Sequence, residues 1–140
     1  MRGKHYLKSW SSTQKTIALS SGEAELTAAV KCSCEIIGIL QLAADWGERH
    51  EGRVYVDSSA ALGVVRRQGA GKLRHVRVGQ LWIQQKCEEG ELRYGKVKGT
   101  NNPADAMTKP MNKAELGRYI PMMGIVARAG RAEASLKVTN

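Results

Sequence analysis

Three acidic residues stand at places in the sequence where they could hold a metal ion. Glu25 lies inside the first turns of a predicted helix, Asp57 ends a short apolar strand, and Asp105 opens a short helix after a loop. Hard cations such as Mg²⁺ prefer carboxylate oxygens, and two ions about 3.5–4 Å apart need several carboxylates from different elements to hydrolyse a phosphodiester. The sequence therefore predicts a metal-dependent site that acts on a polyanion.

Each of these acids also has an ordinary structural interpretation. Glu25 alone is typical of a solvated acid on a helix, and Asp105 could favour a helix N-terminus through the helix dipole. Asp57 could cap the helix that follows it, so that capping and ligation are equally open for this residue. Glu23 stands three residues after Ser20, which is the spacing of a capping box, and we interpret it as a capping residue.

Composition favours a nucleic-acid partner. The 140 residues fit one domain, and 22 Lys and Arg against 13 Asp and Glu give a net charge of +9. No apolar stretch approaches the roughly 20 residues of a membrane span, and no signal peptide opens the chain. We therefore expect an intracellular protein that binds nucleic acid and no membrane. The three cysteines are expected to be reduced thiols of the core or the surface.

The elements that would position the acids follow from hydrophobic periodicity and from turn residues. A strand and a helix alternate, which is typical of α/β layering. The expected elements are extended segments at Tyr6–Trp10 and Thr16–Leu19, a helix from Ser20 to Gly47, a strand at Arg53–Asp57, a short helix with the apolar stripe Ala60, Ala61, Val64 and Val65, a helix at Leu73–Glu89, a strand at Glu91–Val97, a short helix after Pro103 and a helical segment at Lys113–Tyr119. Beyond Gly124 we expect a frayed tail.

A basic cluster follows Asp57. It consists of Arg66, Arg67, Lys72, Arg74 and Arg77, with His75 among them. Lys and Arg side chains bind backbone phosphates without reading bases, so this cluster is a candidate nucleic-acid surface. A solvated basic face is the structural alternative. His75 either orients a phosphate or is a buried or capping histidine.

Four segments, in order, resemble the ribonuclease H domain of copia-type LTR retrotransposon polyproteins. The run Lys8–Glu25 is similar to the segment of this family that ends in A-L-S-S-x-E-A-E. The other three are Asp57–Ala61, Leu73–Val76 and Ala104–Pro110, which are similar to the D-N-x-x-A, K-H-I and A-D-x-x-T-K-P motifs. The resemblance runs from Tyr6 to Met111.

The resemblance implies an α/β, RNase H-like fold, with a mixed sheet flanked by helices and a four-acid site that cuts RNA in RNA–DNA hybrids. Glu25, Asp57 and Asp105 carry over as catalytic residues and as ligands of two Mg²⁺ ions, or of Mn²⁺. The family's first aspartate does not carry over, because none of the residues before Lys8 is acidic. We therefore expect a partial domain over residues 1–111 that lacks the first strands and is impaired in activity, by N-terminal truncation or by decay, and a weakly ordered extension over residues 112–140.

The resemblance also implies partners and a location. An RNA–DNA hybrid is the expected substrate, and the reverse transcriptase part of the same polyprotein is the expected protein partner. The cytoplasm or a virus-like particle is the expected location. The alternative function is a catalytically silent remnant that binds nucleic acid or docks onto reverse transcriptase.

Overall fold

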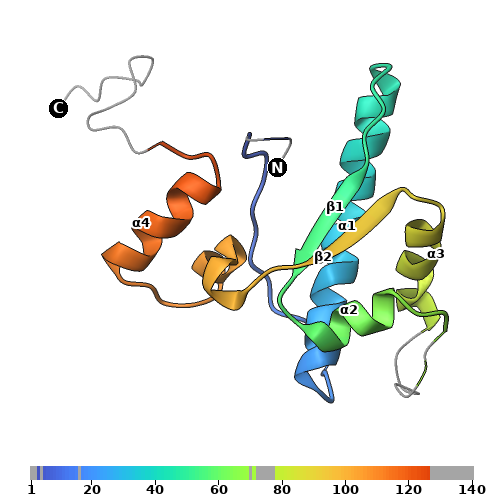
Figure 1. Ribbon diagram of the computed structural model, residues 1–140, viewed down its shortest axis with the longest axis horizontal. Coiled ribbons are helices and arrows are strands. Elements are labelled where there is room, and N and C mark those ends of the chain that lie inside the picture. Colours follow the sequence, from blue (N-terminus) through green and yellow to red (C-terminus); the bar gives the residue numbers. More distant parts are fainter. Residues whose placement is uncertain (1–2, 4, 16, 70, 72–77, 127–140) are drawn as a thin grey trace. The chain divides into compact units, whose positions relative to one another are not determined.

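Two parallel strands form a small sheet in the part of the chain that the structure describes. In the computed structural model, β1 (Gly52–Val56) pairs with β2 (Leu92–Lys96), in a register that runs from Gly52 opposite Leu92 to Val56 opposite Lys96. The architecture is mixed α/β, with helices beside this small sheet (Figure 1). The structure describes residues 3, 5–15, 17–69, 71 and 78–126. They fall into two compact units, Ser12–Asn102 on the one hand and Met1–Ser11 with Pro103–Asn140 on the other.

The first helix, α1 (Ser21–Asp45), begins one residue after the predicted start at Ser20 and ends two residues before the predicted stop at Gly47. Ser20 is its N-cap, and its hydroxyl accepts a hydrogen bond from the Glu23 backbone N–H at 3.2 Å. The Glu23 carboxylate accepts from the backbone N–H of Leu19 at 2.7 Å, one residue before the N-cap. Gly47 follows the helix with a φ of +79°, which glycine adopts without strain. Glu23 is therefore a capping residue, as predicted.

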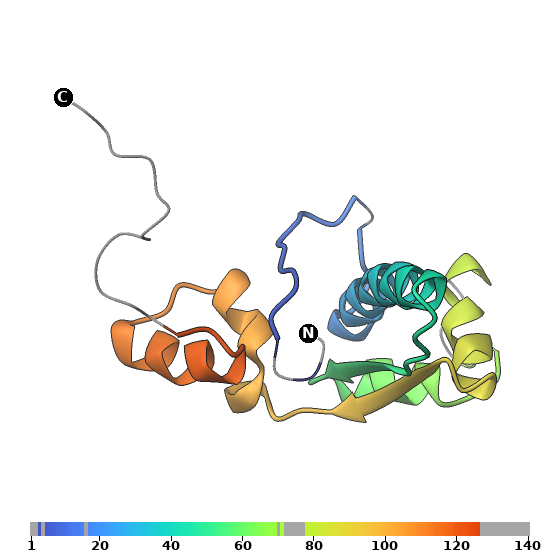
Figure 2. The same cartoon turned by 90° about the horizontal axis from the view of Figure 1, so that it is seen from above.

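One stripe of α1 forms the core against the strands. Leu26, Ala29 and Ser33 are buried on this stripe, and Figure 2 shows α1 on one side of the two strands. A Cβ on Gly52 of β1 would lie 2.6 Å from Ile36 Cγ2 and 2.7 Å from Leu92 Cδ2, so this glycine permits the close packing of α1, β1 and β2. By length and composition alone, α1 could cross a membrane, which corrects the expectation that no stretch approaches that length. The core helix of a soluble protein passes the same test.

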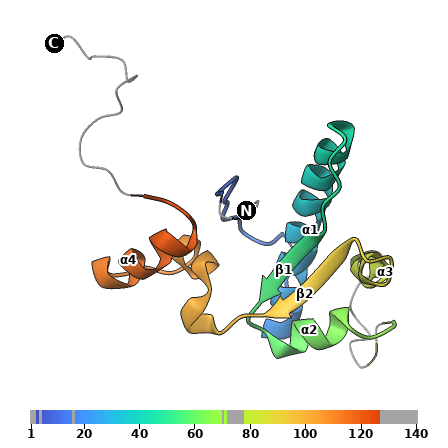
Figure 3. The same ribbon diagram turned by 45° about the horizontal axis from the view of Figure 1, so that its top comes forward.

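Two short helices complete this unit (Figure 3). Helix α2 (Ser59–Val65) buries Ala61, Leu62, Val64 and Val65, so the predicted stripe is wrong in one position, where Leu62 replaces the exposed Ala60. Helix α3 (Trp82–Glu88) follows the 3₁₀ turn η1 (Val78–Gln80), and another 3₁₀ turn, η2 (Gly99–Asn101), follows β2. The predicted helix at Leu73–Glu89 is therefore confirmed only in its second half, and residues 72–77 lie outside the described residues.

The extended segments predicted near the N-terminus are not strands. Among the described residues, 6–15 and 17–19 form no ladder with the sheet, which consists of β1 and β2. Ile17 and Leu19 are 88% and 71% exposed. A strand needs a neighbour for its backbone N–H and C=O groups, so alternation alone does not make one.

The second unit contains the 3₁₀ helix η3 (Pro103–Met107) and α4 (Lys113–Met122). A full capping box starts α4, because Asn112 accepts from the Glu115 backbone N–H and the Glu115 carboxylate accepts from that of Asn112. Tyr119 and Met123 are buried. The division of the chain at residues 111 and 112 stays a prediction, and residues 127–140 lie outside the described residues.

Candidate functional site

Asp57 lies directly after β1, at the end where both parallel strands terminate. The N-cap of α2 is Ser58, whose hydroxyl accepts from the Ala61 backbone N–H at 3.2 Å. Asp57 is therefore not the cap of this helix. Of the two interpretations that the sequence leaves open for Asp57, the structure excludes helix capping. Metal ligation stays open for this half-buried carboxylate.

The chain that follows β2 borders Asp57. The backbone N–H of Val97 donates to the carbonyl of Val56 at 3.0 Å and extends the pairing past the strands. The Asn102 side-chain amide then lies 3.5 Å from Asp57 Oδ2, and a Cβ on Gly99 would lie 3.9 Å from the same oxygen. In open α/β sheets, ligands gather at the carboxyl ends of strands. Asn102 is thus a site residue that the sequence analysis missed, although it stands directly before Pro103 in the segment that holds Asp105.

A second polar contact lies at the same end of the sheet. The Lys96 ammonium, at the end of β2, donates to the hydroxyl of Ser59 at the start of α2. The positive charge is exposed and one strand away from the residue before Asp57, because Lys96 pairs with Val56. A cation at this position could contact an anionic substrate.

Glu25 is half-buried in the first turns of α1. These turns approach the first turn of α2 closely, since a Cβ on Gly22 would lie 2.9 Å from the Cβ of Ala60. The turn that precedes Glu25 thus lies beside the helix that Asp57 precedes. The fold brings the elements that carry these two predicted acids together.

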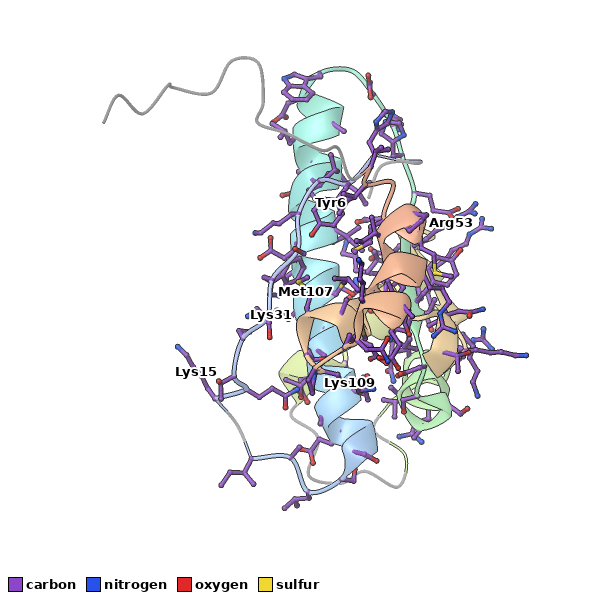
Figure 4. The ribbon with its side chains drawn as sticks, turned by 90° about the vertical axis from the view of Figure 1, so that its left-hand side faces the viewer. Tyr6, Lys15, Lys31, Arg53, Met107 and Lys109 are labelled. Carbon is purple, nitrogen blue, oxygen red and sulfur yellow. The ribbon has the colours of Figure 1, made fainter. Side chains whose placement is uncertain are left out.

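Asp105 lies in η3, in the second unit. Its carboxylate accepts from the Lys109 ammonium at 2.8 Å, and the side chains of Asp105 and Lys109 are 17% and 60% exposed. A pair with so exposed a lysine contributes little to stability, so it can exchange for another cation. Figure 4 shows where Lys109 lies.

No group of three or more His, Cys, Asp or Glu side chains within the described residues is arranged to hold a metal ion. The predicted metal ligands Glu25, Asp57 and Asp105 therefore stay a prediction. Their chemistry fits Mg²⁺ or Mn²⁺, because all the donors are carboxylate oxygens.

Two residues of the predicted basic cluster are described. Arg66 follows α2 and donates a side-chain hydrogen bond to the backbone carbonyl of Tyr94 at 3.3 Å. The Arg67 guanidinium lies against Gly71, where a Cβ would be 2.5 Å from Arg67 Cζ, and Gly71 has a φ of +57°. The other members, Lys72, Arg74, His75 and Arg77, lie outside the described residues.

A buried glutamine fixes the start of the basic loop. The Gln84 side chain on α3 donates to the carbonyls of Val64, at 2.7 Å, and Gly69, at 3.1 Å, and accepts from the Gly69 backbone N–H at 2.9 Å. These three hydrogen bonds bracket Arg66 and Arg67. The sequence gives no signal for this role, because a glutamine in a helix is ordinarily a surface residue.

Cys32 and Cys87 are not activated nucleophiles. Burial raises the pKa of the Cys32 thiol and of the Cys87 thiol, which keeps both protonated near neutral pH. Desolvation likewise raises the pKa of Tyr94 to about 12, and the phenol is hydrogen-bonded to the buried Ser33 hydroxyl. All three thiols are free, as the sequence predicts.

Comparison with known proteins finds relatives among transposon polyproteins. The chain is 34% identical over 113 residues to the retrovirus-related Pol polyprotein from transposon TNT 1-94 of Nicotiana tabacum, over 77% of this chain and 8% of that polyprotein. It is 26% identical over 126 residues to the retrovirus-related Pol polyprotein from transposon RE2 of Arabidopsis thaliana, over 87% of this chain and 9% of that polyprotein. The chain thus spans less than a tenth of the length of these curated relatives. No family model and no solved structure matches it. The likeness supports a region derived from a retrotransposon Pol polyprotein.

Proposed function

We propose that this retrotransposon-derived region is an RNase H-like domain that hydrolyses the RNA strand of RNA–DNA hybrids with Mg²⁺. The observation that carries the proposal is the position of Asp57. Asp57 is a half-buried carboxylate at the shared carboxyl end of two parallel strands and lies beside Asn102. Ser58, and not Asp57, caps the helix that follows. A carboxylate in that position with no role in the helix start suits metal ligation.

The proposed ligands are Glu25, Asp57 and Asp105. A bound Mg²⁺ ion, or Mn²⁺ in its place, would supply an activated water and charge stabilisation at the phosphate. The Asn102 amide lies 3.5 Å from Asp57 Oδ2 and can donate to that carboxylate. Lys109 neutralises Asp105 and gives way when a stronger cation arrives, because the lysine is mostly exposed.

The proposed substrate surface starts at the end of α2. Arg66 and Arg67 lie between Val64 and Gly69, the two residues that Gln84 holds, and the Arg66 guanidinium donates to the Tyr94 carbonyl. Lys72, Arg74, His75 and Arg77 follow in sequence and extend the proposed surface. Contacts to phosphates bind any sequence, whereas the 2′-hydroxyls and the groove shape distinguish the RNA strand.

The test is cleavage of a labelled RNA–DNA hybrid by the purified chain in Mg²⁺. Asp57→Asn removes the ligand charge and keeps the shape, and Asp45→Asn, at the exposed end of α1, is the matched control. Cleavage that Asp57→Asn abolishes and Asp45→Asn preserves supports the proposal. Equal cleavage by both variants would overturn the role of Asp57. Circular dichroism on the same samples shows that each variant is folded.

One observation favours a second function. The described residues contain no ready group of three metal-binding side chains, and Asp105 is paired with Lys109. A chain of net charge +9 could then bind a hybrid without cutting it, or dock onto the reverse transcriptase part of the same polyprotein, in the cytoplasm or a virus-like particle. Hybrid binding in EDTA without cleavage in Mg²⁺, by a folded chain, would favour the silent binder. Loss of binding unless reverse transcriptase is present would favour the docking module.

A further inference from the structure

The face of the sheet opposite the core carries two arginines and a tyrosine. In β1 the buried residues alternate with the exposed Arg53 and Tyr55. In the register of the sheet, Arg53 lies opposite Arg93, and Tyr55 lies opposite Gly95. Side chains on one face of paired strands are neighbours, so these residues form a single surface. We call it the outer face, and Figure 4 shows Arg53 on the side away from α1.

The Tyr55 ring rests on the backbone of β2. A Cβ on Gly95 would lie 2.8 Å from Tyr55 Cε1 and 2.9 Å from Tyr55 Cδ1. Real Cβ atoms essentially never come this close, so only glycine at position 95 lets the ring take this place. One side of the ring thus covers the glycine, and the tyrosine remains 61% exposed. The other side of the ring is available as a stacking surface.

The arginines beside the ring are held in place but remain exposed. Glu51 accepts a hydrogen bond from Arg53 Nε at 3.0 Å and forms an ion pair with Arg93 Nε at 2.8 Å, so one carboxylate pairs with two guanidinium groups. The two side chains are 64% and 70% exposed. Because one negative charge faces two positive ones, the outer face keeps an excess of positive charge.

We propose that the outer face binds single-stranded nucleic acid, with a base stacked on Tyr55 and neighbouring phosphates on Arg53 and Arg93. Base–aromatic stacking together with basic side chains is how sequence-tolerant single-strand binding works. A duplex could place phosphates on the arginines but offers Tyr55 no base face, because its bases are already stacked on each other, so a single strand makes both kinds of contact. The proposal uses no metal ion and none of the proposed catalytic acids, so it stands apart from hybrid cleavage.

Charge complementarity favours this occupant over a protein segment. An apolar segment packed on Tyr55 would take the two arginines out of water with only the Glu51 carboxylate to balance their charges, which is unfavourable. Phosphates supply the missing negative charge and accept hydrogen bonds from guanidinium groups.

The test measures binding of a labelled oligothymidylate to the full chain in EDTA, with fluorescence anisotropy as the readout. Tyr55→Val keeps a residue suited to a strand but removes the aromatic ring, and we expect affinity to fall about tenfold. Tyr55→Phe keeps the ring, and affinity is expected to stay within about twofold. Tyr55→Trp gives a direct readout, since a base stacked on the new indole quenches its fluorescence above the wild-type background.

Charge variants separate the outer face from general electrostatics. Arg53→Gln and Arg93→Gln should each lower the slope of log affinity against log salt by about 0.7. Lys31→Gln removes the same charge from the exposed surface of α1, on the other side from Arg53 in Figure 4, and is the matched control. It should leave the slope of the wild type unchanged.

The proposal is overturned if folded Tyr55→Val binds as tightly as wild type, or if Tyr55→Trp shows no added quenching at saturation. It is also overturned if Lys31→Gln lowers the salt slope as much as Arg53→Gln does, because binding then follows net charge alone. Hybrid cleavage in Mg²⁺ is measured separately. Its loss with oligothymidylate binding intact would count against the proposed ribonuclease function only.

Discussion

Gly22 of α1 and Ala60 of α2 lie so close that a Cβ on Gly22 would be 2.9 Å from the Cβ of Ala60. This contact joins the helix turn before Glu25 to the helix turn after Asp57. The distance between the elements that carry Glu25 and Asp57 therefore depends on residue 22 being a glycine, which has no side chain. In this way a packing detail fixes the geometry of the candidate site.

Gly22→Ala should destabilise the chain by about 1–2 kcal/mol, because the added methyl group overpacks the contact with Ala60. Gly38→Ala, in the same helix with nothing within 4 Å of its Cβ, should stabilise by about 1 kcal/mol through helix propensity. Urea unfolding measures both. Adding Ala60→Gly to Gly22→Ala should restore most of the lost stability. Equal effects of Gly22→Ala and Gly38→Ala would contradict the contact.

Ser58→Ala should lower the free energy of unfolding by about 1 kcal/mol, because Ser58 supplies the N-cap of α2. Asp57→Asn should change it by less than half as much, since Asp57 caps nothing. Ser59→Ala, one residue on, removes a hydroxyl that contacts only the exposed Lys96 ammonium and caps no helix, so it should cost less than Ser58→Ala. A larger loss from Asp57→Asn than from Ser58→Ala would restore the capping interpretation of Asp57.

Gln84→Leu should cost about 2–3 kcal/mol, because it leaves the carbonyl of Val64 and both backbone groups of Gly69 without their side-chain partner. Gln85→Leu, on the exposed side of α3 and bonded only to Glu89, should stay within about 0.5 kcal/mol. The same pair tests the loop. Hybrid binding in EDTA should weaken in folded Gln84→Leu and not in Gln85→Leu, and equal binding would show that the loop needs no such support.

Stability should decline at alkaline pH through Tyr94. Burial raises its pKa from 10.0 to about 12, so the unfolded chain loses this proton before the folded chain does. The contribution is complete below pH 10.0 and is lost as the pH rises toward about 12. Urea unfolding across this range should show a shallower decline in Tyr94→Phe. Ser33→Ala should keep the decline, because burial and not the Ser33 hydrogen bond is the main cause of the shift. An unchanged decline in Tyr94→Phe would assign it to other groups, such as the half-buried Cys32 thiol, whose pKa is also raised by burial.

Features that depend on near neighbours in the chain could be predicted from the sequence. Ser20 and Glu23 fix the start of α1, Gly47 follows its end, and the run around Val54 forms β1 as expected. Capping hydrogen bonds and positive φ angles involve residues a few positions apart, so their signals are local. The sequence also predicts the element on or next to which each of Glu25, Asp57 and Asp105 lies.

Other features depend on residues that only the fold brings together. Residues 6–10 alternate like a strand but have no ladder partner, because pairing is a property of two segments. Asn102 reaches Asp57 only because the parallel pairing brings the chain after β2 back to the end of β1. Tyr55 covers Gly95 for the same reason, since the register of the two strands sets which residues are neighbours. The sequence alone determined the local elements and the types of their polar residues. Only the tertiary structure decided which of those residues meet, because these contacts join segments far apart in the chain.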